Sequence, residues 1–271
     1  MKIAILICLM LVLAVVLAQL VVARGFLAEV ARQEEVIRTA PVPELRDPVE
    51  IPELMRAFAL RGLAGRDGMP RAVRLTQEAE MLRGEDWSPL VARQHIAIAE
   101  PGFAWVAEQP GWPVPAVRVI DRFTGGNGLL EVRLFGSIPL ARVEGSDADV
   151  GEAMRYLVEL PWVPDAILSN QSITWRQVDA NAIEAELSLS SRPAIVRYRF
   201  DDAGNVEKIS AKDRPDVSSG ETVLREWRGL FSDYAEINGR RIPRAAEVGY
   251  VDSGVYAPYL RVRVSSYEML E

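Results

Sequence analysis

The chain has 271 residues, of which 49% are hydrophobic and 25% are charged, so its composition is that of a globular protein and not of a disordered one. Thirty-one Lys and Arg stand against 38 Asp and Glu, and the net charge of −7 argues against a protein that binds nucleic acid through phosphate contacts. One cysteine, Cys8, and one histidine, His95, exclude an internal disulfide, a zinc site built on cysteines and a metal site that needs two histidines. We therefore expect no metal and no cofactor.

An apolar run occupies the N-terminal end of the chain. Between Ile3 and Ala23, Gln19 is the only polar side chain, and at about 1.5 Å per residue a helix of this length spans the roughly 30 Å hydrocarbon core of a membrane. The run predicts a transmembrane anchor over residues 1–24. A cleaved signal peptide is the alternative, because Lys2 precedes the run and Ala23 ends a stretch of small residues, but the apolar core of a signal peptide is usually only about 7 to 15 residues long.

The orientation of the anchor depends on two opposing signals. Arg24, Arg32 and Arg38 follow the run, and basic residues near a span tend to stay in the cytoplasm. Against this, residues 25–271 contain no cysteine, which is typical of an exported bacterial domain, and we expect a single-pass protein of the cytoplasmic membrane with a periplasmic domain. Beyond residue 24, 29 basic and 38 acidic residues give a net charge of −9, so we expect the anchor alone to hold the domain at an anionic bilayer.

A stalk and a linker are predicted over residues 25–52. Phe26, Val30 and Ile37 are the apolar positions of an otherwise polar helical segment that ends before a group of prolines, which comprises Pro41, Pro43, Pro48 and Pro52. A short helix around Glu53–Leu63 follows and opens a single domain over residues 53–271.

Most of this domain alternates apolar and polar residues with period 2, which predicts strands. The predicted strands are Ala72–Leu82, the segment around His95, Val117–Phe123, Leu129–Phe135, Ser172–Val178, Ala182–Leu189, Ala194–Phe200, Val206–Lys212, Phe231–Ile237, Arg241–Val251 and Pro258–Glu268. Turns of glycine and asparagine join several of them, as at Gly125–Gly128 and Asn238-Gly239. One amphipathic helix, Asp147–Leu160, interrupts the series. We predict a mainly β (α+β) fold, in which a large curled antiparallel sheet or half-barrel wraps this helix, preceded by the transmembrane helix.

Common catalytic signatures are missing. The sequence contains no Gly-x-Ser-x-Gly elbow, no phosphate-binding Gly-x-x-x-x-Gly-Lys loop and no His-Glu-x-x-His helix. His95 lies on the more polar side of its strand with no recognisable nucleophile, and Gly125–Gly128 is a hairpin turn by its context. The acidic pairs Asp147/Asp149 and Asp201/Asp202 fit a helix N-terminus and a turn better than a cation site. We expect no catalytic residue and no enzyme.

The stretch Arg155–Leu168 is the densest in aromatic and charged groups. One interpretation makes it ligand-binding: Trp162 and Trp175 form an apolar wall, Arg155 binds an anionic group, and Tyr156 belongs to the same ligand-binding set. The other makes Trp162 a plug between the helix and the sheet, with Arg155 and Glu159 an ordinary i,i+4 ion pair.

A resemblance rests on this stretch and on landmarks after it. The landmarks are Trp175, Asp179, Trp227, Tyr234, Gly239 and Ile242-Pro243. Together they resemble an uncharacterised bacterial family, a domain of unknown function that follows a hydrophobic N-terminal segment, over about Pro52–Tyr267. The resemblance implies the half-barrel fold of lipoprotein carriers such as the LolA group, and it implies no catalytic residue.

Three functions remain open at this stage. The first is a non-catalytic, membrane-anchored binding domain of the cell envelope for an apolar or amphipathic ligand, such as a lipid or acyl chain. The second is a structural or interaction module of a membrane complex, whose protein partner is unknown. The third is a carboxylate-dependent hydrolase, since two suitably spaced acids need no sequence motif.

Overall fold

A computed structural model describes the chain except for residues 1, 48–49, 66–67, 112–113 and 218–220, which include Pro48 of the predicted linker. The helices are α1 (Lys2–Arg38), α2 (Glu53–Gly62), α3 (Ser146–Glu159), the 3₁₀ turn η2 (Leu160–Trp162) and α4 (Pro164–Ser169). The strands are β1 (Ala72–Arg83), β2 (Asp86–Ala97), β3 (Phe103–Gln109), β4 (Val117–Thr124), β5 (Asn127–Leu134), β6 (Ile138–Glu144), β7 (Ile173–Asp179), β8 (Ala182–Leu187), β9 (Ala194–Phe200), β10 (Val206–Asp216), β11 (Val223–Ile237), β12 (Arg240–Asp252) and β13 (Val255–Leu270).

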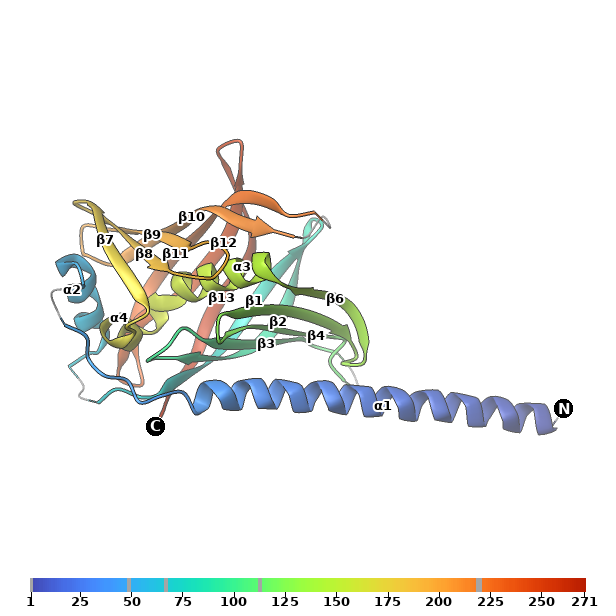
Figure 1. Ribbon diagram of the computed structural model, residues 1–271. Coiled ribbons are helices and arrows are strands. Elements are labelled where there is room, and N and C mark those ends of the chain that lie inside the picture. The colour runs from blue at the N-terminus through green and yellow to red at the C-terminus, as the bar shows by residue number, and fades with distance from the viewer. Residues whose placement is uncertain (1, 48–49, 66–67, 112–113, 218–220) are drawn as a thin grey trace.

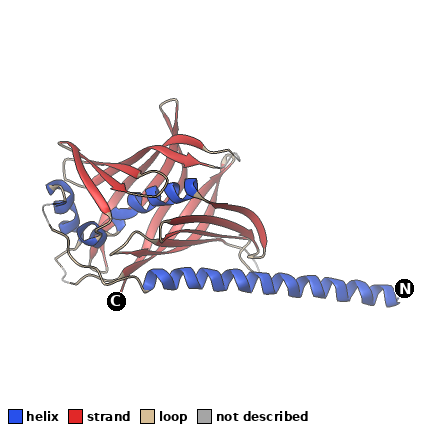
Figure 2. Cartoon of the chain, in the orientation of Figure 1, coloured by secondary structure: helices blue, strands red, loops and turns tan. Residues whose placement is uncertain are grey.

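All of these strands join one antiparallel sheet. Its order is β6-β5-β4-β3-β2-β1-β13-β12-β11-β10-β9-β8-β7, so β6 and β7 are the two edges and the N- and C-terminal strands β1 and β13 pair in the middle. The sheet curls so that the β4–β6 arm and the β7–β10 arm face one another with α3 between them (Figure 1). Figure 2 shows that helix covers both sides of this sheet, α3 inside the curl and α1 outside it.

The concave face encloses the main core. α3 contacts β4, β5 and β6 on one arm and β8, β9 and β10 on the other, and its buried positions extend around the whole helix. The core joins α3 to aromatic and aliphatic residues of nearly every strand, including Phe103, Trp105, Trp227 and Phe231. A sheet this long must curl to cover its apolar face, and α3 fills the space that the curl creates.

The convex face is covered by the second half of α1. Phe26 and Val30 pack on Val106 and Ile120, and Ile37 packs in a second small cluster with alanines of β1, β2 and β3. The first half of the helix, up to residue 22, is exposed throughout and is long and apolar enough to cross a membrane. One continuous helix therefore contains the predicted anchor and the predicted stalk, and the stalk is docked on the sheet.

α2 and α4 close one end of the half-barrel (Figure 1). A side chain on Gly62 of α2 would approach the Cβ of Pro164 to 2.5 Å, so only glycine permits this contact. Below it, the fully buried guanidinium of Arg240 donates to both carboxylate oxygens of Asp165, at 2.9 and 2.8 Å. This bidentate pair fixes α4 to the start of β12.

The predicted fold class is confirmed, including the curled sheet, the single helix inside it and the N-terminal helix. Two strands, β3 and β6, are additional to the predicted set, and both lack alternation for a physical reason. The first five residues of β3 are buried, because α1 covers one side and the core covers the other, whereas β6 is exposed along nearly its whole length as an edge. The proline-rich boundaries Pro41–Pro52 and Pro161–Pro164 are predicted to be non-strand, and their described residues contain no strand.

Candidate functional site

Five charged side chains gather between α3 and the sheet. We call them the ion cluster: Asp121, Glu152, Arg155, Glu159 and Arg214. The four besides Arg155 are at most 8% exposed, and the Arg155 side chain is 13% exposed. Charges are rarely buried unless they are paired, so five in one core mark this place as unusual.

The backbone brings these groups together from three directions. Glu152, Arg155 and Glu159 are three and then four residues apart on α3, which puts them on one face of the helix. Asp121 is on the concave side of β4, directly opposite Trp105 of β3. Arg214 comes from β10 on the other arm, so the charged stripe of α3 is held from both sides of the half-barrel.

Arg155 is the centre of the ion cluster. Its Nε donates to Glu159 Oε1 at 2.9 Å, and its Nη1 donates to Asp121 Oδ2. The guanidinium lies over the rings of Phe103 and Trp105, 5.0 and 4.9 Å from their centroids. Burial by itself would lower the pKa of Arg155, but the surrounding carboxylates outweigh it and raise the pKa, so the guanidinium stays charged.

A chain of hydrogen bonds extends the cluster across the sheet. The Gln94 amide donates to Glu159 Oε2, the Gln77 amide donates to Gln94 Oε1 at 2.9 Å, and the Trp105 indole N–H donates to Gln77 Oε1 at 2.9 Å. Gln94 lies directly opposite Trp105 on the neighbouring strand. The polar chain thus runs from β1 to β4 beneath α3, through an otherwise apolar wall.

Arg214 holds the other side of the helix. Its Nη1 donates to the carbonyl oxygen of Gly151 at 2.5 Å, and its Nη2 lies 3.5 Å from Glu152 Oε1. The guanidinium lies over the Trp227 ring at 4.1 Å, and the Trp227 indole N–H donates to the Tyr259 hydroxyl at 3.1 Å. Tyr259 in turn stacks on Tyr250, with 5.5 Å between the ring centroids.

Burial raises the pKa of both glutamates of the cluster, but at Glu159 the Arg155 guanidinium and the Gln94 amide oppose the rise. Burial, and the Asp121 carboxyl beside Glu152, raise the pKa of Glu152 well above the usual value, so the protonated form is favoured. Glu152 Oε2 and Asp121 Oδ1 are both buried with no hydrogen-bond partner among the described residues. With Glu152 neutral, two arginines balance two carboxylates. Arg214 Nε still lacks a partner.

Two of the predicted ligand-binding residues, Arg155 and Trp162, sit as the plug interpretation describes. Arg155 forms the i,i+4 pair with Glu159. Trp162 is 4% exposed, its indole N–H donates to the Pro243 carbonyl oxygen at 2.9 Å, and its ring meets Phe231 edge-on at 5.8 Å. Both are core groups in this structure.

The other two predicted residues, Tyr156 of α3 and Trp175 of β7, have different hydrogen-bond environments. Tyr156 is fully buried, and its hydroxyl accepts from the Asn170 amide at 2.8 Å. Trp175 belongs to the edge strand β7, packs against Tyr198 at 5.9 Å, and keeps a buried indole N–H without a partner. The four residues do not form one wall, and their contact with a ligand stays a prediction.

His95 lies on the convex side of β2, opposite the apolar side, as predicted, but it is only 3% exposed because α1 covers it. Its Nδ1 is 3.6 Å from Glu34 Oε1 of α1, and burial lowers the pKa of His95 to about 4. The imidazole is therefore neutral over most of the pH range and belongs to the packing of the stalk.

The acidic pairs also have structural partners. Asp149 Oδ1 accepts from the Gly128 backbone N–H at 2.8 Å, and the Asp201 carboxylate accepts from the backbone and side chain of Asn205 within a turn. Within the described ranges, no group of three or more His, Cys, Asp or Glu is arranged to hold a metal ion.

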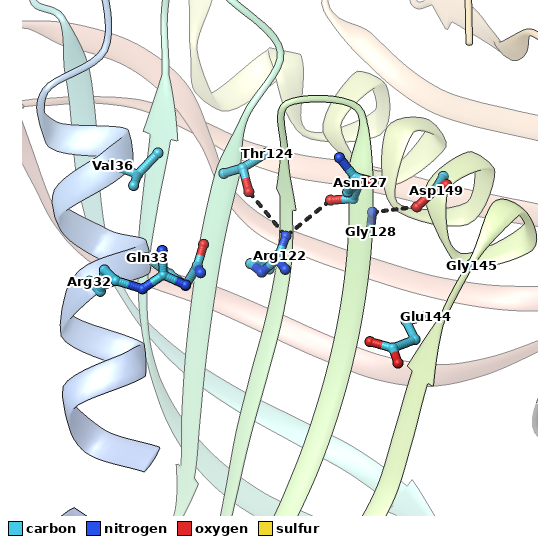
Figure 3. A pocket seen from close by; sticks show the side chains of 10 residues that line it. All are labelled: Arg32, Gln33, Val36, Arg122, Thr124, Asn127, Gly128, Glu144, Gly145 and Asp149. Atoms are coloured by element: carbon cyan, nitrogen blue, oxygen red, sulfur yellow. Dashed lines mark hydrogen bonds between the residues drawn. The ribbon is translucent and has the colours of Figure 1, made fainter. Parts of the chain in front are cut away.

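An open cleft of about 490 Å³ lies between α1 and the β4–β5 hairpin (Figure 3). It is lined by Arg32, Gln33, Val36, Arg122, Thr124, Asn127, Gly128, Glu144, Gly145 and Asp149. Arg122 Nη1 donates to Thr124 Oγ1 at 3.0 Å and to the Asn127 carbonyl oxygen at 3.2 Å. Charges of both signs line the cleft, and Val36 is its one large apolar side chain, so it does not suit an acyl chain.

Several buried polar residues near the ion cluster were not predicted to be functional, although the sequence contains a pattern that marks them. Gln77, Gln94 and Asp121 are each in phase with the apolar residues of their strands, so each is a polar residue on the face that packs inward. A polar side chain in such a position needs a buried partner. The identity of that partner depends on α3, which no local pattern connects to these strands.

A comparison with protein families shows to which family the chain belongs. Residues 41–262 match the family described as "Family of unknown function (DUF6544)". The chain belongs to this family. The match confirms the resemblance drawn from Arg155–Leu168 and its landmarks, and it brings no activity with it. No curated protein matches the sequence.

Solved structures with a similar arrangement are all distant. A DUF1329 family protein from Desulfovibrio piger is 11% identical, with 83% of this chain and 94% of that chain covered. A putative outer membrane lipoprotein-sorting protein domain from Vibrio parahaemolyticus is 10% identical, with 79% and 91% covered. A LolA superfamily protein from Nitrosomonas europaea is 9% identical, with 80% and 94% covered. The TM-score is 0.45 in each case, so the functional argument rests on this chain's own geometry.

Proposed function

We propose that the protein is a membrane-anchored, non-catalytic binding domain of the bacterial cell envelope, on the periplasmic side, for an apolar or amphipathic ligand such as a lipid or acyl chain. The ligand occupies the concave side of the half-barrel. Because α3 is buried on all sides there, the ligand takes its space by displacing it.

One observation carries the proposal: α3 is fixed to an apolar wall by a buried ion cluster. Buried ion pairs contribute little net stability, and apolar residues of similar volume often stabilise a core as well or better. Apolar side chains of α3 also pack in the main core, so the ion cluster is the part of this packing that an incoming anionic group can replace with contacts of its own.

The ligand chemistry follows from what α3 covers. Phe103, Trp105 and Trp227 lie under the helix or beside it and offer apolar rings, while Arg155 and Arg214 offer cations deep in the same space. An acyl chain with an anionic group matches both features. We expect the ligand to enter beside Trp175, which lies on the edge strand β7 and has an indole N–H without a partner.

Native mass spectrometry of the full chain, extracted from membranes in a mild detergent, tests the proposal. We expect an added mass of lipid size that organic extraction removes. Trp175→Ala should reduce it, whereas Trp87→Ala should not, because Trp87 lies under Arg261 away from the core. A bare polypeptide mass, together with no uptake of a fluorescent fatty acid, would favour the interaction module instead.

The raised pKa of Glu152 bears on the expectation that the chain is not an enzyme. A carboxyl with a raised pKa is what a general acid needs, but both groups are less than 10% exposed and face arginines. A screen against glycoside and ester substrates tests this expectation. Turnover that disappears in Glu152→Gln would show that the protein is a carboxylate-dependent hydrolase.

A further inference from the structure

We propose that the domain makes a second contact with the bilayer, through apolar side chains of the β5–β6 turn and the start of β6. The contact lies where α1 leaves the membrane. It goes beyond the binding function above and rests only on the anchor role of α1.

The first observation is the level of the β5–β6 turn along α1. Ala23 ends the apolar run, and it is the first residue of α1 that the domain partly covers. A Cβ on Gly136, in the turn, would lie 3.7 Å from the Cβ of Ala23. Figure 1 shows the same relation, with the β5–β6 end of the domain beside the middle of α1 and the apolar half of the helix extending beyond it. When residues 3–23 span the membrane, the turn lies at the bilayer surface.

The second observation is that this level is fixed. α1 continues without a break from the apolar run into the segment docked on the sheet, where Phe26 and Val30 are each 4% exposed. The guanidinium of Arg133, on β5, also lies over the Phe26 ring at 4.9 Å. No flexible tether lies between Ala23 and this docked segment, so the domain cannot move away from the membrane while α1 spans it.

The third observation is what the turn presents. Phe135 is 51% exposed, Ile138 42% and Leu140 56%, and all three lie within six residues of one another around Gly136. Phe135 also adopts a φ of 52°, a left-handed conformation that a bulky side chain rarely takes. Contacts with the core do not compensate for this strain, because the Phe135 side chain is directed away from the core. Burial of the ring in the acyl region of a bilayer would compensate for it.

The chemistry of the contact is apolar and not electrostatic. With a net charge of −9, residues 25–271 gain nothing from an anionic surface, which agrees with the expectation from sequence. The anchor is therefore not, as was expected from the sequence, the only part of the chain that holds the domain at the bilayer. A narrow apolar contact at one end also places the edge strand β6, which contacts α3, next to the lipid.

A lipid-quenching experiment on the full chain tests the contact. Cys8→Ala removes the native thiol, and single cysteines at positions 135, 138, 17 and 255 carry an environment-sensitive fluorophore. The proteins are reconstituted in phosphatidylethanolamine and phosphatidylglycerol vesicles in which some lipids carry a nitroxide near the top of the acyl chain. Val255 is 69% exposed at the β12–β13 hairpin and serves as the matched control. Thermal unfolding in detergent confirms that each labelled protein is folded.

We expect quenching at positions 135 and 138 to be several-fold stronger than at position 255, and unchanged at high salt. Equal quenching at 135 and 255 overturns the proposal. A second result also overturns it: the probe at position 135 is shielded from water but is not quenched by nitroxide, and the shielding increases with protein concentration. In that case a second copy of the chain covers the patch. Absence of quenching at position 17 overturns the anchor together with the contact, which separates that failure from the first.

Discussion

Two helices pack on opposite faces of one sheet through apolar side chains, and their ion pairs differ in burial. On the convex face, α1 docks through small apolar clusters, with its ion pairs at the solvent edge: Arg93 Nε donates to Glu34 Oε1 at 2.6 Å, and the Arg93 side chain is 46% exposed. On the concave face, α3 packs in the main apolar core, and the ion pairs of Arg155 with Asp121 and Glu159 are buried there with it. The same kind of contact is weak at the surface and decisive in the core, because the cost of an unpaired charge depends on its burial.

The largest expected effect comes from breaking the buried side of this comparison. Arg155→Ala leaves the carboxylates of Asp121 and Glu159 buried without their cation, and we expect a loss of about 3 to 5 kcal/mol in the free energy of unfolding. Arg93→Ala, which removes an exposed pair, should cost about 1 kcal/mol or less. Urea unfolding of the detergent-solubilised protein measures both. Equal losses would contradict the contrast between the two faces.

A second effect concerns pH at the convex face. Because burial lowers the pKa of His95 from 6.5 to about 4, the unfolded chain binds a proton between these values and the folded chain does not. The neutral imidazole makes its full contribution to the free energy of unfolding above pH 6.5, and this contribution is lost as the pH falls toward 4. The full loss is about 3 kcal/mol, from roughly 1.4 kcal/mol per pKa unit.

The charged groups near His95 act on this shift in both directions. Glu34 raises the pKa of His95, whereas Arg93, Arg74 and Arg38 lower it. We expect the free energy of unfolding of His95→Gln to fall less steeply between pH 6.5 and 4.5 than that of the natural protein. Parallel curves for the two proteins would show that His95 is solvated and that α1 does not cover it.

The smallest expected effect tests the protonation of Glu152 in the ion cluster. Since Glu152 favours its protonated form, Glu152→Gln keeps the charge balance, and we expect less than about 1 kcal/mol of change in the free energy of unfolding at pH 7. Asp121→Asn is the matched variant, because it removes the partner of Arg155 and should destabilise clearly more. A larger loss in Glu152→Gln than in Asp121→Asn would mean that Glu152 carries the negative charge.

The sequence predicted the sheet and the helix inside it because strand alternation and helical periodicity are local patterns. The alternation of β2 puts Gln94 in phase with the apolar residues of its strand, but it does not reveal that Glu159, 65 residues later, receives its hydrogen bond. The sequence marked Phe26, Val30 and Ile37 as one apolar helix face, but it did not reveal that the convex side of the sheet covers them. Such pairings between distant segments depend on how the sheet curls, and no window of sequence contains that information.

The central claim is that a ligand reaches the concave side by displacing α3, and a reversible lock on this helix tests it most directly. A Cβ on Gly229 of β11 would lie 3.5 Å from Val158 Cγ1 of α3, so Val158→Cys with Gly229→Cys, in the Cys8→Ala background, places two thiols within disulfide range. The measurement is equilibrium binding of a fluorescent long-chain fatty acid to the full chain before and after reduction, with the two single-cysteine variants as controls. We predict binding to the reduced protein and its loss in the oxidised one. Equal binding in both states would contradict displacement of α3.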